Sequence, residues 1–131
     1  MKQINIDAMD TIVSELAAGK KLSAALKTVY STRSLQIPMS YSDVDIRVKD
    51  MRMSNRTTNA LLRAKLLTLT DVVRYTENNK LIDIKNMGTS CCIELMETIV
   101  DYLWNKMNKR EKAEFLMQTV ELNEFHLACY A

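Results

Sequence analysis

Apolar positions along most of the chain recur at spacings of three and four, which is the period of an amphipathic α-helix. Residues 5–18 show this pattern first, with Asn5 placed to cap the helix and Gly19 placed to end it. The apolar stripe of this helix comprises Ile6, Met9, Ile12, Val13, Leu16 and Ala17.

A second helix is expected to follow, with Ser23 as its N-cap. The pair has the outline of a helix-turn-helix, but Glu15 occupies a position where that motif needs a small buried residue. We therefore expect an ordinary helical hairpin.

Residues 31–45 are the longest stretch without helical periodicity. Within this stretch, Pro38 favours an extended backbone at the residue before it, Ile37. We expect this stretch to be a connector. Residues 44–53 then alternate between apolar and charged positions, which is typical of a strand. Because the rest of the sequence offers no partner strand, an extended arm packed on helices is expected instead.

Helical periodicity resumes in the second half of the chain. It predicts helices at residues 55–65 (capped by Ser54), at 70–75, from Asn78 or Asn79, from Gly88 to about Met107, and at 109–122. The helix after Gly88 is expected to be the longest. Residues 123–131 form an unusually apolar tail, expected to pack on the body or to form an association surface.

Composition agrees with a helical protein. The chain has 131 residues, two glycines, one proline and few aromatics, which favours an all-α fold over a β-sandwich. The predicted architecture is a compact bundle of short helices with a helix-hairpin-helix-like unit, flanked by an N-terminal helical pair and a C-terminal helix. The expected divisions are residues 1–45 (appendage and connector), 46–107 (central unit) and 108–131 (helix and tail).

The net charge of +2 is distributed unevenly. Residues 46–90 carry nine Lys or Arg against four Asp or Glu, whereas residues 91–131 carry four against seven. A basic segment attracts polyanions such as nucleic acid. Taken alone, an excess of this size is more typical of a solvated charged face.

Several classes of function find no support in the sequence. No apolar run reaches the length of a membrane helix, and the N-terminus lacks a signal-peptide core, so a cytoplasmic protein is expected. The three cysteines lack metal-site spacing, and His126, the single histidine, has no ligand or catalytic partner at a suitable spacing. Without a phosphate loop or a nucleophile motif, we expect neither an enzyme nor a cofactor or metal.

One constellation points to DNA. Arg56, Asn59 and Arg63 are spaced to share one helix face, and a turn through Lys85 and Asn86 to Gly88 precedes another helix. A guanidinium gains from the concentrated negative potential of a narrow A·T minor groove. The backbone N–H groups of Gly88, Thr89 and Ser90, at a helix N-terminus, can hold a phosphate. The two elements together predict a preference for A·T-rich shape rather than a full base code.

The segment MRMSNRTTNALLRAKLLTLTDVVRYTENNKLIDIKNMGTSCCIELMETIVDYLW resembles the C-terminal domain of the bacterial RNA polymerase alpha subunit, over about residues 46–104. The shared motifs are Arg-x-x-Asn-x-Leu, Thr-x-x-Asp-Val-Val and Leu-x-x-Ile-Lys-Asn-x-Gly. The resemblance implies four or five short helices that bind the A·T-rich minor groove and contact sigma factor or activators. It assigns the groove-inserted arginine to Arg56, the asparagine to Asn59, the turn glycine to Gly88 and a partner-binding carboxylate to Glu94.

The sequence departs from this family at three positions. Ser90 and Cys91 stand where a lysine and a serine are usual, and Ala60 replaces a position that is commonly polar or cysteine. Loss of a phosphate-facing lysine lowers the expected DNA affinity.

Three functions stay open. The first is a transcription-associated protein that binds A·T-rich DNA. The second is a module that docks on RNA polymerase, sigma factor or a regulator without binding DNA, and the third is a self-associating structural protein. The oligomeric state and the target DNA sequence are left open.

Overall fold

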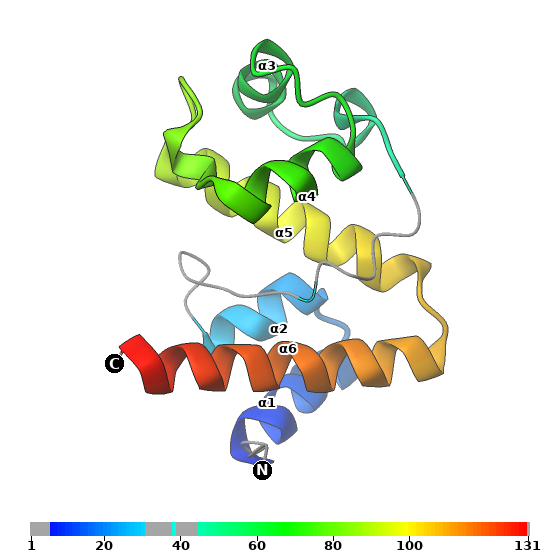
Figure 1. The fold of residues 1–131 in the computed structure, drawn as a ribbon. Helices are drawn as coiled ribbons and strands as arrows, with labels where there is room; N and C mark the ends of the chain where they lie inside the picture. Colours follow the sequence, from blue (N-terminus) through cyan, green and yellow to red (C-terminus); the bar gives the residue numbers. More distant parts are fainter. Residues whose placement is uncertain (1–5, 31–37, 39–44, 131) are drawn as a thin grey trace. The chain divides into compact units, whose positions relative to one another are not determined.

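The computed structural model describes residues 6–30, residue 38 and residues 45–130, and Figure 1 traces them in order. Within these ranges the named elements are all helices, which confirms the predicted all-α class. None of the described helices combines the length and the apolar content needed to cross a membrane. The elements are α1 (Ile6–Ala17), α2 (Leu22–Val29), the 3-10 helix η2 (Val48–Asp50), α3 (Asn55–Arg63), α4 (Leu69–Asn78), the 3-10 helix η3 (Leu81–Asp83), α5 (Thr89–Lys106) and α6 (Lys109–Tyr130).

The protein divides into two compact units. Unit 1 contains residues 1–41 and 99–131, and unit 2 contains residues 42–98. Helix α5 begins in unit 2 and ends in unit 1.

Within unit 1, α1 and α2 form the expected helical hairpin. Gly19 adopts a φ of 91°, which a glycine tolerates without strain. The N–H of Gly19 donates to the Leu16 carbonyl at 3.0 Å, and that of Lys20 donates to the Glu15 carbonyl at 3.2 Å. These two bonds are a Schellman motif, which ends α1 at the predicted place.

Two predictions about this hairpin are wrong. Only part of the α1 stripe is buried, because Ala8 and Ile12 face the core while Ile6 and Val13 are 70% and 49% exposed. Ser23 is not the N-cap, because α2 already begins at Leu22. The Ser23 N–H and hydroxyl instead donate to the Asp101 carboxylate of α5, at 3.0 and 2.6 Å.

Helix α6 extends to Tyr130, past the predicted end at residue 122, and it is longer than α5. Asn108 and Glu111 cap its start through reciprocal hydrogen bonds of 2.8 and 3.1 Å. The presumed tail contains no glycine or proline to stop the helix, and buried Asn123 continues its inner side. The Tyr30 hydroxyl donates to Glu124 at 2.6 Å and ties α2 to α6.

The core of unit 1 is made by all four helical segments. Trp104 packs against Phe115 with the ring centroids 6.4 Å apart, and Lys112 lies 5.2 Å over the Trp104 ring. The fully buried large side chains are Ile12, Leu22, Leu26, Ile99, Val100, Phe115 and Val120. This unit contains none of the DNA-contact candidates.

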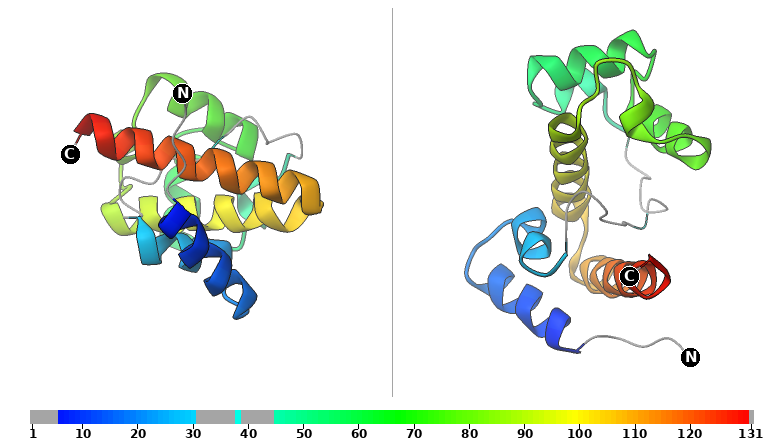
Figure 2. Two further views of the ribbon diagram at one scale, coloured as in Figure 1. Left: turned by 90° about the horizontal axis from the view of Figure 1, so that it is seen from below. Right: turned by 90° about the vertical axis from the view of Figure 1, so that its left-hand side faces the viewer.

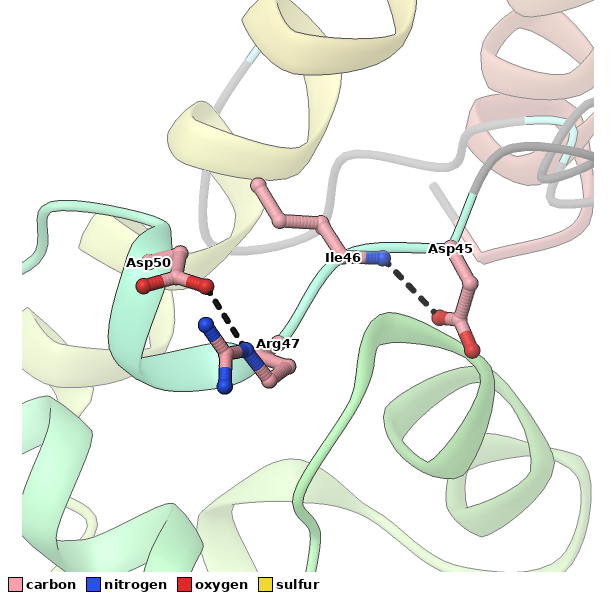
Figure 3. A network of polar contacts seen from close by, with 4 residues as sticks. All are labelled: Asp45, Ile46, Arg47 and Asp50. Carbon is pink, nitrogen blue, oxygen red and sulfur yellow. Dashed lines mark hydrogen bonds and ion pairs between the residues drawn. The ribbon is translucent and has the colours of Figure 1, made fainter.

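Unit 2 begins with the expected arm, which is extended at residues 45–47 and then turns into η2. Arg47 and Thr68 form an isolated antiparallel bridge, through a bond from the Val48 N–H to the Leu67 carbonyl at 2.8 Å and one from the Leu69 N–H to the Ile46 carbonyl at 2.9 Å. Figure 3 shows the local contacts of the arm, including the Arg47 Nε bond to Asp50 at 2.9 Å. The arm is thereby held against the start of α4.

Helix α4 begins and ends beyond its predicted limits of Thr70 and Tyr75. Thr68 and Asp71 form a capping box at its N-terminus, and the Asp45 carboxylate adds a third acceptor by binding the Thr70 N–H at 3.1 Å. That bond is the main reason why the pKa of Asp45 lies below its ordinary value. The helix predicted from Asn78 or Asn79 is reduced to η3. Its apolar pattern predicts that Ile82 faces inward, but Ile82 is exposed.

Candidate nucleic-acid interface

The candidate contacts on α3 are exposed because the other side of this helix is buried. Ser54 caps α3 as predicted, accepting a bond from the Thr57 N–H at 3.4 Å. The buried positions of α3 are Thr57, Ala60 and Leu61. Arg56, Asn59 and Arg63 are all exposed, as their spacing predicts. In the part of the sequence that the structure describes, these three side chains form no ion pair or hydrogen bond.

The turn before α5 is anchored by two buried apolar side chains, Ile84 and Met87, and the Met87 N–H donates to the Ile84 carbonyl at 3.0 Å. The left-handed residue of this turn is Asn86, with a φ of 68°, and not Gly88. Asparagine is one of the few residues that tolerate this conformation. Lys85 and Asn86 are exposed on the turn.

Gly88 stands at the start of α5, where its carbonyl accepts the Cys92 N–H at 3.0 Å. The next two residues, Thr89 and Ser90, are exposed in the first turn of α5, where helix geometry leaves backbone N–H groups without intrahelical acceptors. The Arg56 side chain reaches this point: its Nη2 lies 3.6 Å from the position that a Cβ on Gly88 would occupy. The guanidinium and the N-terminus of α5 therefore meet.

Glu94, one turn further along α5, fixes α3 to α5. Its carboxylate accepts the Ser54 N–H at 3.0 Å, the Ser54 hydroxyl at 2.8 Å and the Thr57 hydroxyl at 2.5 Å. Partial burial raises the pKa of Glu94, but the bonds from Thr57 and Ser54 outweigh it, so that the pKa lies below the ordinary value. Glu94 thus holds the N-terminal end of the helix that carries Arg56.

Two further cations, both among the nine Lys or Arg of residues 46–90, extend the basic surface around α3. Arg52 and Lys65 bracket the helix, both exposed and both in left-handed conformations with φ of 57° and 62°. The signal in the sequence is the absence of any acidic residue between Asp50 and Asp71, a segment that holds four cations. The α3 segment is therefore basic throughout.

Comparison with known proteins points to one family for unit 2. Residues 38–101 match the model of the family described as the C-terminal domain of the bacterial RNA polymerase alpha subunit. Unit 2 is similar to that domain. The DNA-directed RNA polymerase subunit alpha of Gloeobacter violaceus is 31% identical over 68 residues, which are 52% of this protein and 21% of that subunit. The protein thus spans about a fifth of the length of this relative. No solved structure matches it significantly.

The three departures from the alpha C-terminal domain differ in their consequences. Ala60 and Cys91 are buried, at 1% and 4% exposure, so these substitutions leave the exposed surface unchanged. Ser90 is exposed, so the missing lysine does remove a surface cation. Burial and the neighbouring Cys91 raise the pKa of the Cys92 thiol, which favours its protonated form.

Proposed function

We propose that this protein is a small transcription-associated DNA-binding protein whose alpha C-terminal-domain-like unit binds the A·T-rich minor groove and its backbone. The observation that carries the proposal is the approach of the Arg56 guanidinium to Gly88 at the start of α5. Arg56 enters the groove, and the amides of Gly88, Thr89 and Ser90 bind a flanking phosphate. Asn59, Arg63 and Lys85 add contacts to the sugar–phosphate backbone.

The direct test is a titration of labelled duplexes of equal length, one A·T-rich and one G·C-rich, at low salt. We expect tighter binding of the A·T-rich duplex, and Arg56→Ala should lower its affinity about tenfold, the effect typical of one groove contact. Arg74→Ala is the matched control, because Arg74 is an exposed arginine of unit 2 that lies on α4. It should change the affinity less than about twofold.

Two results contradict the proposal. One is equal affinity for the two duplexes, since a minor-groove reader distinguishes A·T from G·C pairs. The other is an Arg56→Ala variant that binds as the wild type does. A loss of the same size in Arg74→Ala would show a general effect of charge rather than a groove contact.

A second candidate function is docking on RNA polymerase, sigma factor or a regulator without a grip on DNA. The exposed Ser90 at the lysine position favours it, because a phosphate contact of the family is missing there. The resemblance implies that Glu94 contacts a protein partner. In the structure its carboxylate accepts hydrogen bonds from Ser54 and Thr57, and its contact with a partner stays a prediction. Retention of purified polymerase or sigma factor on the immobilised protein, undiminished in Arg56→Ala, would support this function.

A further inference from the structure

Unit 1 exposes more large apolar side chains than unit 2. Among the described residues, unit 2 exposes Leu67 and Ile82, whereas unit 1 exposes Ile6, Val13, Met117, Leu122, Phe125 and Leu127. Clusters of such side chains mark interaction surfaces more often than isolated ones do.

The apolar residues of α1 form such a cluster. Ile6 and Val13 are seven residues apart, which places them on the same side of the helix two turns from each other. Ala17 continues this line and is also exposed, and Met9 and Leu16 lie half-buried beside it. We call these five residues the outer face of α1. The right-hand view of Figure 2 shows α1 at the edge of unit 1, next to α2 and α6.

The charges at the two ends of α1 are of opposite sign. Asp7 and Asp10 are exposed in the N-terminal half of α1. Lys20 and Lys21 are exposed just beyond its C-terminal end, where Lys20 also pairs with Glu15. Two such helices packed antiparallel bring the acidic end of each alongside the basic end of the other. The dipoles of the two helices then point in opposite directions, which is the favourable arrangement for helices that lie side by side.

We propose that two copies of this protein associate through the outer faces of α1, packed antiparallel about a two-fold axis. A second copy supplies the matching apolar stripe and the complementary charges by construction, which is the property of an isologous interface. An interface of two short helices is small, so the dimer is weak and dependent on concentration. The inference stands on unit 1 alone and does not depend on the proposed function.

Sedimentation of the 131-residue protein over a range from about 5 to 500 µM tests the association, since weak dimers dissociate in this range. We expect the mass to rise from 15.0 kDa toward twice that value. Val13→Asp should keep the protein monomeric, and circular dichroism should show an intact fold because Val13 is 49% exposed. Ile82→Asp is the matched control, since Ile82 is 48% exposed in unit 2, and it should dimerise as the wild type does.

Charge exchange tests the antiparallel arrangement. One variant carries Asp7→Lys and Asp10→Lys, and the other carries Lys20→Glu and Lys21→Glu. Each alone should dimerise at least tenfold more weakly, because like charges then meet at both ends. An equimolar mixture should recover the dimer as a heterodimer. A wild type that is monomeric throughout, a Val13→Asp variant that still dimerises, an Ile82→Asp variant that does not, or a mixture that fails to recover would each overturn the proposal.

Discussion

Arg56 and Gly88 define the candidate interface at the scale of single residues. The backbone angle of Gly88 does not require a glycine, because the left-handed residue of the turn is Asn86. A methyl group on Gly88 would lie at ordinary van der Waals distance from the Arg56 Nη2. Protein stability and ligand binding should therefore respond differently to substitution at this position.

Gly88→Ala is expected to leave the free energy of unfolding within about 0.5 kcal/mol of the wild type, because the new methyl group meets no clash. The same methyl group stands beside the amides at the start of α5, where a phosphate must approach closely. Affinity for the A·T-rich duplex should fall several-fold. Denaturant titration and duplex titration of the same preparation measure the two effects, and unchanged affinity would remove Gly88 from the interface.

At the scale of elements, the helix faces that sequence periodicity predicted well are those that carry strong polar signals. Arg56, Asn59 and Arg63 share the outer side of α3 because the spacing of its buried residues leaves them no other position. The α1 stripe was misjudged because periodicity shows that a face is apolar without showing whether another element covers it. The bonds from Ser54 and Thr57 to Glu94 could not be predicted, since they join residues distant in sequence through tertiary packing alone.

Glu94 should make the attachment of α3 to α5 dependent on pH. Because its pKa is lowered in the folded state, the stabilisation is complete above the ordinary pKa of a glutamate and is lost as the pH falls through the folded-state pKa. Glu94→Gln should lower the free energy of unfolding at pH 7 by about 1 kcal/mol, which is the typical contribution of a helix cap. Denaturant titrations at pH 7 and near pH 3 should show that difference shrink at the lower pH.

Ser23 provides the control for this experiment. Ser23→Ala also removes a bond to a carboxylate of α5, but this bond lies in unit 1, whereas α3 belongs to unit 2. It should lower stability without changing duplex affinity, whereas Glu94→Gln should lower both. Equal effects of the two variants on duplex affinity would mean that Glu94 acts through stability alone.

At the scale of the whole molecule, net charge is a poor guide to DNA binding, because acidic and basic residues occupy different parts of the sequence. In unit 2 the carboxylates of Asp45, Asp71 and Glu94 accept hydrogen bonds from backbone N–H groups at the starts of helices. The α3 segment itself contains no acid. A small number of exposed cations, rather than the +2 of the whole protein, should therefore determine the response to salt.

The logarithm of the binding constant should fall linearly with the logarithm of salt concentration, with a slope near −3 if about three phosphates are neutralised. Arg56→Ala should reduce the magnitude of this slope by about one only if Arg56 also neutralises a phosphate. If binding weakens while the slope stays unchanged, Arg56 contacts the floor of the groove and not a phosphate. Arg63→Ala and Lys85→Ala, at the proposed backbone-contact positions, should each reduce the magnitude of the slope by about one, and Arg74→Ala should leave it unchanged. A slope near zero for the wild type would exclude phosphate neutralisation, because counterion release accompanies every such contact.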